Sequence, residues 1–185
     1  MTQATRPVLT GGTVTLRPLT RLDAPAIHAG LEDPEARRLT GTHARHTLAE
    51  MEAHYARAET AADRCDYGII AGGALIGEAV VNGIDWPNKA ASFRIVIWQA
   101  TARAKGFGSA AAALLLRHGF EALGLNRIEL EVYAFNPRAR RVYEKLGFRL
   151  EGTRREALIW DGEAVDAHIM SLLKREYRAA SPMGG

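Results

Sequence analysis

The sequence predicts a single α+β domain, because strands follow one another in its middle part and alternate with helices after it. Three strand-like segments occur in succession, from Tyr67 to Ala71, from Leu75 to Val81 and from Phe93 to Trp98. The first two are joined at Gly72-Gly73, which is a β-hairpin signal. No helical segment separates these three strands, so the strand–helix–strand order of a doubly wound parallel fold is not met.

Local signals place the other elements. Asp23 is a helix start signal, Asn136 followed by Pro137 is another, and Gly124 and Gly147 are suited to end helices. Helices are expected at residues 23–31, 48–60, 110–123 and 137–146. Further strands are expected at 13–17, 128–133, 148–155 and 165–173, with a turn at 161–162. Together they predict one domain over residues 1–178 and a flexible tail over 179–185.

The composition is that of an ordinary globular protein, with 47% hydrophobic and 24% charged residues in a chain of 185. The net charge is only +3, but 20 of the 24 basic residues are arginine. Arginine pairs with phosphate and carboxylate, so acidic ligands fit. We find no basic block typical of nucleic-acid binding and no apolar run near the ~18 residues of a membrane span. We therefore expect no nucleic acid, no membrane and a cytoplasmic location.

Neither cysteine nor histidine forms a recognisable metal motif. Cys65 is the sole cysteine, so an intrachain disulfide and a cysteine cluster are excluded. His43, His46 and His54 match no usual ligand spacing, and no acidic cluster completes a site. We expect no metal.

The segment from Arg103 to Ala110, Arg-Ala-Lys-Gly-Phe-Gly-Ser-Ala, predicts an anion-binding loop between a strand and a helix. Free N–H groups and the positive end of the helix dipole favour phosphate at such a junction. Gly106 and Gly108 allow the main chain to approach a ligand closely, and Arg103 and Lys105 add positive charge.

The same loop also satisfies the dinucleotide fingerprint G-x-G-x-x-G/A, from Gly106 to Ala111. That fingerprint belongs at the first strand–helix turn of a doubly wound fold. Here several strands precede the loop, and Glu129 and Glu131 lie mid-strand, where they would not reach a ribose. The surrounding elements therefore argue against a nicotinamide cofactor.

A second motif decides between these interpretations. After one helix and one strand, the loop is followed by Asn136-Pro137-Arg138-Ala139 and then by the run Val-Tyr-Glu-Lys-Leu-Gly-Phe at 142–148. This pair of motifs closely resembles the GNAT superfamily of acyl-CoA-dependent N-acetyltransferases, over roughly residues 10 to 175. Leu31-Glu32-Asp33-Pro34 and the ending around Asp161-Gly162 and Met170-Ser171-Leu172 resemble the RimJ/RimL-like branch, the ribosomal-protein N-acetyltransferase type.

The resemblance implies a fold and a donor site. It implies a mixed, mostly antiparallel sheet of about six or seven strands, with a V-shaped splay between two central parallel strands and about four flanking helices. Acetyl-CoA would be the co-substrate, its pyrophosphate on the loop amides and its pantetheine arm beside the strand before the loop. By position, the residues implied are Val96, Ile97, Trp98, Arg103, Lys105, Gly106, Phe107, Gly108, Ser109, Asn136 and Ala139. Asn136 can equally be a simple helix cap.

Two residues are candidates for the chemistry. The family match favours Tyr143 as a general acid that protonates the departing thiolate, whereas its spacing alone also fits a core tyrosine. Glu78 is the first candidate for the base, because a carboxylate in an apolar strand needs a reason. An outward-facing surface glutamate explains Glu78 equally well.

The acceptor is a primary amine, and a protein or peptide N-terminal α-amine is favoured by the branch that the chain resembles. A small amine such as an antibiotic, polyamine or amino acid, and a non-catalytic acyl-CoA-sensing module, stay open. Glu32 and Asp33 are candidates for gripping the amine. Arg94 stands where relatives often carry glycine, in Ser92-Phe93-Arg94, which predicts a bias toward acidic acceptors. Because members often dimerise, the resemblance also leaves a homodimer open.

Overall fold

The computed structural model describes residues 6–180 and contains one mixed sheet of eight strands in the order β1-β2-β3-β4-β5-β6-β8-β7. The strands that the described part contains are β1 (Leu9–Gly11), β2 (Val14–Pro18), β3 (Arg64–Ala71), β4 (Ala74–Asp85), β5 (Ala90–Ile97), β6 (Arg127–Tyr133), β7 (Arg149–Trp160) and β8 (Glu163–Leu173). All neighbouring pairs are antiparallel except β5 and β6, which run parallel. The α+β fold with a central parallel pair is therefore confirmed.

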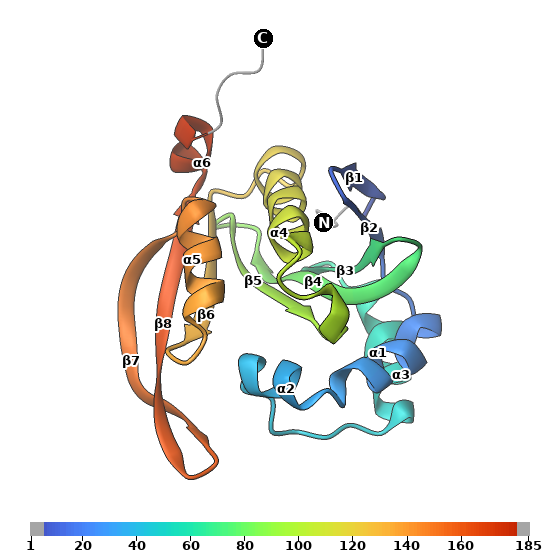
Figure 1. Ribbon diagram of the computed structural model, residues 1–185. Coiled ribbons are helices and arrows are strands. Elements are labelled where there is room, and N and C mark those ends of the chain that lie inside the picture. Colours follow the sequence, from blue (N-terminus) through green and yellow to red (C-terminus); the bar gives the residue numbers. More distant parts are fainter. Residues whose placement is uncertain (1–5, 181–185) are drawn as a thin grey trace.

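The parallel pair is joined only at its beginning. Ala90, Ala91 and Ser92 of β5 lie opposite Arg127, Ile128 and Glu129 of β6, and no pairing continues beyond them in the described strands. The Lys89 carbonyl fixes this end by accepting from the amides of Asn126 at 2.7 Å and Arg127 at 3.1 Å. Figure 1 shows β5 and β6 side by side at this end and diverging toward α2. The implied V-shaped splay is therefore present.

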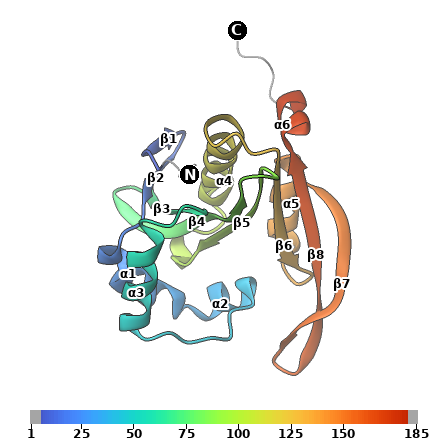
Figure 2. The ribbon, with the colours of Figure 1, turned by 180° about the vertical axis from the view of Figure 1, so that it is seen from behind.

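Helices cover both faces of the sheet. Six α-helices lie in the described part of the chain: α1 (Ala24–Leu31), α2 (Pro34–Thr40), α3 (Leu48–Ala58), α4 (Phe107–Arg117), α5 (Pro137–Lys145) and α6 (Lys174–Ala180). Helices α4 and α5 supply side chains to the larger apolar core, and α1, α2 and α3 supply a smaller core on the other face. Figure 2 shows α1–α3 grouped together, away from α4 and α5.

Side-chain alternation assigns the central residues to these two faces. Ala79, Val81 and Phe93 belong to the core under α4 and α5. Glu78 lies opposite Val96, and Val80 lies opposite Arg94. These four side chains therefore share the other face, toward α1–α3, where Val96 packs against the smaller core.

The structure corrects several sequence expectations. The sheet has eight strands rather than six or seven, because the three-residue strand β1 is too short to give an alternation signal. Helices α2 and α6 were not expected, although Asp33 followed by Pro34 is a good helix start. The helix expected from residue 110 begins at Phe107 and ends in a π-helical turn, His118–Ala122. Of the expected tail 179–185, the first two residues end α6 and the rest lie outside the described residues.

Two further observations concern chemistry. Within residues 6–180, no helix has both the length and the apolar character required to cross a membrane. Cys65 is fully buried in β3, and burial raises the pKa of its thiol to about 11. This thiol is therefore a core residue with little thiolate character.

A substitution of Gly77 can test the close contact between β4 and β5. A β-carbon on Gly77 would lie 2.3 Å from the Val96 carbonyl oxygen, which no Cβ tolerates. We expect Gly77→Ala to push β5 from β4 and to cost about 1–3 kcal/mol of unfolding free energy, measured by thermal denaturation. Gly152→Ala on β7 is the matched control, because nothing lies within 4 Å of its β-carbon. Equal stability of the two variants would contradict this account.

Candidate active site

A cavity of about 740 Å³ lies between the diverging strands. Its walls come from β4, β5, β6, α2, the glycine loop and α5. The splay opens the sheet, so residues from both faces line this one space. Phe93, Ile95 and Tyr143 line it from the side of α4 and α5, and Glu78 and Arg94 line it from the side of α1–α3. The fold thus brings together residues that an intact sheet would keep apart.

The glycine loop has the backbone of an anion site. Ala104 and Gly106 both adopt left-handed conformations, with φ of 62° and 83°, and Gly106 is the N-cap of α4 without a side-chain cap. The N–H groups of the first turn of α4 therefore lack intrahelical partners. Gly106, Gly108 and Ser109 line the cavity. Of the other loop residues predicted to bind the cofactor, Lys105 is exposed and Phe107 packs against the core.

The guanidinium of Arg103 forms hydrogen bonds and ion pairs with other residues of the protein. Its side chain is 10% exposed and donates to the carbonyls of Ile97 at 2.9 Å and Trp98 at 2.7 Å. It also pairs with Asp33 and, at 2.8 Å, with Glu35. Asp33 in turn accepts from the Ala36 amide at 2.7 Å, as the N-cap of α2. Two residues predicted to hold different ligands are thus bonded to each other, and their predicted ligand roles stay predictions.

The predicted strand residues differ in where their side chains lie. Val96 and Ile97 line the cavity. Trp98 is buried in the smaller core instead, against Gly30, where a β-carbon would lie 2.4 Å from the indole. Of the three, the structure therefore brings only the first two side chains to the cavity.

Asn136 and Ala139 lie where α5 begins. The Asn136 side chain accepts from the Ala139 amide at 3.1 Å, which makes it the N-cap of α5. Both residues also line the cavity, together with Arg138 and Val142, which sequence reasoning missed. The helix-cap interpretation of Asn136 is correct, and it leaves the cofactor role open.

Tyr143 is buried yet reaches the cavity wall. It is 8% exposed and packs against Phe93 and Phe148, with ring centroids at 6.3 and 5.9 Å. Burial alone raises the pKa of its hydroxyl to about 12, so the phenol is fully protonated near neutral pH. No hydrogen-bond partner for this hydroxyl occurs among residues 6–180. A proton is therefore available for a ligand.

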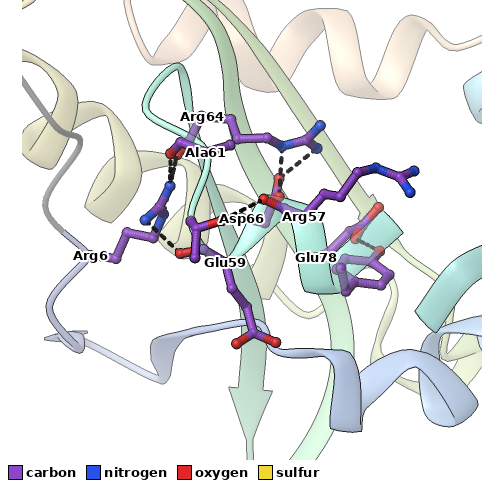
Figure 3. Close-up of polar contacts among 9 residues, drawn as sticks. Arg6, Arg57, Glu59, Ala61, Arg64, Asp66 and Glu78 are labelled. Carbon is purple, nitrogen blue, oxygen red and sulfur yellow. Dashed lines mark hydrogen bonds and ion pairs between the residues drawn. The ribbon is translucent and has the colours of Figure 1, made fainter. Parts of the chain in front are cut away.

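The surroundings of Glu78 shift the pKa of its carboxylate. It is half-buried, lines the cavity and accepts a hydrogen bond from the Tyr55 hydroxyl at 2.7 Å. Burial raises the pKa of Glu78 above its usual value, and Asp66 adds to the rise, while the Tyr55 hydrogen bond, Arg94 and Arg64 oppose it. Figure 3 shows Glu78 near the bonded pair Arg64 and Asp66.

Glu78 is thus half-buried and hydrogen-bonded rather than an outward-facing surface glutamate, and its role as the base stays a prediction. Tyr55, on the helix expected at 48–60, was not among the predicted site residues. Its hydroxyl contact depends on α3 packing over β4, which sequence spacing does not encode.

Glu32 and His43 do not line the cavity. Glu32 is exposed and paired with Arg45. His43 stacks on Trp160 at 4.8 Å between ring centroids. Among residues 6–180, no group of three His, Cys, Asp or Glu side chains could hold a metal ion.

Comparison with known proteins identifies this arrangement. A family model described as an acetyltransferase (GNAT) domain matches residues 13–149. The chain belongs to the GNAT acetyltransferase family. Members of this family use acetyl-CoA.

Individual relatives differ in what their names say they act on. The uncharacterized N-acetyltransferase p20 of Bacillus licheniformis is 41% identical over 73 residues, 40% of this chain and 41% of its own length. The candidate ribosomal N-acetyltransferase YdaF of Bacillus subtilis (strain 168) is 35% identical over 111 residues, 60% of each chain. The chain thus spans about half the length of these curated relatives.

A solved structure matches over a longer range. The spermidine N-acetyltransferase from Vibrio cholerae, crystallised with CoA and spermine, has a TM-score of 0.85 at 26% identity. The match covers 91% of this chain and 99% of that chain.

Arg103 can be tested as a structural anchor. We expect Arg103→Ala to lower the free energy of unfolding by about 3 kcal/mol, the low end for a broken buried pair, because Asp33 and Glu35 keep some hydration. Lys105→Ala, at an exposed loop position, should leave the melting temperature unchanged and weaken only CoA binding. Thermal denaturation and calorimetric titration with CoA separate the two. An unchanged melting temperature for Arg103→Ala would refute the anchor.

Tyr55 can be tested as the residue that tunes Glu78. A base works only when deprotonated, so activity should fall as pH drops through the raised pKa of Glu78. Tyr55→Phe removes a donor that favours the carboxylate, so the pKa should rise further and the acidic limb of kcat/KM should move to higher pH. Tyr177→Phe, which loses a hydroxyl contact to Glu121 at 3.3 Å, is the matched control. Coincident profiles for Tyr55→Phe and the control would exclude the tuning.

Proposed function

We propose that the protein is an acetyl-CoA-dependent N-acetyltransferase that acts on an α-amine by direct transfer. One observation carries the proposal: Tyr143 and Glu78 come from opposite faces of the sheet and line one cavity, next to a free helix N-terminus. An acid on one side and a base on the other suit a reaction that moves one proton off an amine and another onto a thiolate.

The bond changes follow from these two positions. The amine nitrogen attacks the thioester carbonyl carbon and forms the N–C bond, while Glu78 accepts the amine proton. The C–S bond then breaks, and the Tyr143 hydroxyl donates its proton to the departing sulfur. Acetyl-CoA supplies the acetyl group when bound. The buried thiol of Cys65 takes no part, so no covalent acyl-enzyme is needed.

The acidity of Tyr143 sets a condition on this mechanism. With its pKa raised to about 12, transfer to a thiolate of reference pKa about 8.5 would be uphill by ~5 kcal/mol. The sulfur leaves inside the same apolar wall, however, and desolvation raises the pKa of a thiol as it does that of a phenol. The two groups are therefore closer in acidity inside the cavity than their separate values suggest.

The pKa of the acceptor amine determines how much help the amine needs from a base to lose its proton. An α-amine of pKa ~8 is neutral in about one molecule in ten at pH 7, against about one in 2,500 for a lysine of pKa ~10.4. The Glu78 carboxylate, which already accepts one hydrogen bond, is a sufficient base for an α-amine. We infer a protein or peptide N-terminus, in keeping with the RimJ/RimL-like motifs. A polyamine is the second candidate, favoured by the likeness to the Vibrio cholerae structure with spermine.

Two measurements test the proposal. Thiol release from acetyl-CoA, with a panel of peptide α-amines, lysines, polyamines and aminoglycosides, should show turnover with α-amines. An acyl-CoA sensor would instead bind the donor and release no thiol with any amine.

Tyr143→Phe isolates the acid step. Loss of a general acid typically costs 10²- to 10⁴-fold, so kcat should fall by about that factor while the Kd for CoA stays nearly constant. The removed oxygen has no hydrogen-bond partner among the described residues 6–180, so the fold should be retained. Wild-type turnover by Tyr143→Phe would sink the acid role.

A further inference from the structure

The cavity wall on the side of α1–α3 has an unusual charge distribution. We call this wall the acceptor wall and define it by Glu35, Arg38, Glu78, Arg94, Glu131 and Tyr133, all of which line the cavity. Strand alternation places it on the face away from α4, because Glu131 and Tyr133 continue the register that pairs Ser92 with Glu129. The glycine loop that suits the coenzyme phosphates lies at the N-terminus of α4, on the other face. Glu35 of this wall reaches Arg103 at the start of the glycine loop, but Glu78 and Arg94 lie on the strands, so we expect their charges to meet the acceptor rather than those phosphates.

The carboxylates of the acceptor wall are already engaged. Glu35 pairs with Arg103 at 2.8 Å, and Glu131 accepts from Arg154 at 2.6 Å. Glu78 accepts from Tyr55 at 2.7 Å and is assigned to proton transfer. A polycationic acceptor would therefore find little unpaired negative charge on this wall.

The cations of the same wall form no ion pair with an acid within residues 6–180, although Arg94 lies close enough to Glu78 to favour its charged form. Arg94 is exposed, and Arg38 is exposed with its guanidinium carbon 4.5 Å from the centre of the Phe135 ring. Within residues 6–180, neither guanidinium forms an ion pair or a side-chain hydrogen bond. Arg94 lies diagonally across the β4–β5 ladder from Glu78, a separation of roughly 7–8 Å between α-carbons. A ligand that gives its amine to Glu78 would thus bring its next few atoms to Arg94.

We propose that the acceptor carries a carboxylate near the reacting amine, and that Arg94, assisted by Arg38, binds this carboxylate. The proposal rests on the proposed function and deepens it: the substrates are acidic α-amino compounds, with peptides that have an acidic residue next to the N-terminus as the favoured form. Arginine suits this role because its planar fork pairs with both carboxylate oxygens. Arg94 is here a substrate-binding residue, and Glu78 keeps the proton transfer.

The test compares matched acceptors with acetyl-CoA as donor. The peptides Ala-Glu-Ala-amide and Ala-Gln-Ala-amide have second side chains of nearly the same shape that differ in charge, and Ala-Lys-Ala-amide reverses the charge. Free glutamate and spermidine extend the series. We expect kcat/KM for the Glu peptide to exceed that for the Gln peptide by about tenfold, through KM, as for one charge-assisted contact. Equal or better turnover of the Gln peptide, the Lys peptide or spermidine would overturn the inference.

Variants assign the preference to the arginines. Arg94→Gln should reduce the Glu-to-Gln preference to near unity, and Arg94→Glu should shift it toward the Lys peptide. Arg38→Gln should act in the same direction with a smaller effect. Arg117→Gln, at an exposed position near the end of α4, is the control that should keep the wild-type preference. If Arg94→Gln slowed all acceptors equally, a structural role would replace the proposed one.

Two further comparisons test whether the carboxylate that depends on Arg94 belongs to the acceptor, and whether the variant is folded. Succinyl-CoA would bring a carboxylate on the acyl group, so a dependence on Arg94 found only with succinyl-CoA and a neutral acceptor would contradict an acceptor role. Melting temperature and CoA affinity, unchanged in Arg94→Gln, show that the variant is folded and loads donor. An enzyme inactive with every amine would refute the proposed function and this inference with it. Activity with the wrong preference would refute the inference alone.

Discussion

The short pairing between β5 and β6 is the constraint on which the rest of the structure depends. Each strand is held along its length by an antiparallel neighbour, β4 for β5 and β8 for β6, but the two are joined to each other over three residue pairs only. Beyond Ser92 their facing edges carry backbone groups that no strand within residues 6–180 satisfies. Such groups need a partner, and an extended, amide-containing ligand arm can supply one. The same divergence creates the cavity and allows both sheet faces to contribute to it.

Arg103 connects the two sides of this opening. It follows the end of β5 in the chain, and its guanidinium ties the last carbonyls of that segment to Asp33 and Glu35 at the start of α2. Helix α2 supplies Arg38 to the acceptor wall. One side chain thus couples the position of the glycine loop to the position of a helix that lines the cavity. Arg103 itself lines the cavity as well, so its predicted contact with the cofactor stays a prediction beside this structural role.

The sequence predicted the parts of the site that short-range chemistry specifies. Asn136 before Pro137 and the turns at Gly72-Gly73 and Asp161-Gly162 follow from local backbone preferences and are found, whereas the helix expected from residue 110 begins earlier, after the left-handed N-cap Gly106. Arg103 and Asp33 were assigned to separate ligands, because they lie 70 residues apart in the chain and only the packing of α2 against β5 reveals their pairing. The hydrogen bond from Tyr55 to Glu78 escaped prediction for the same reason. Alternation showed that Glu78 needed an explanation, but not which helix would supply its partner.

The opposite placement of Tyr143 and Glu78 also bears on the kinetic order of the reaction. Under the proposed function, the donor lies on the α4 side of the cavity and the amine on the α1–α3 side, so one substrate need not leave before the other binds. Both would then be present when the new bond forms, as direct transfer requires. In this fold, the break in the sheet leaves one cavity that is lined from both faces, so that each substrate can have a face of its own.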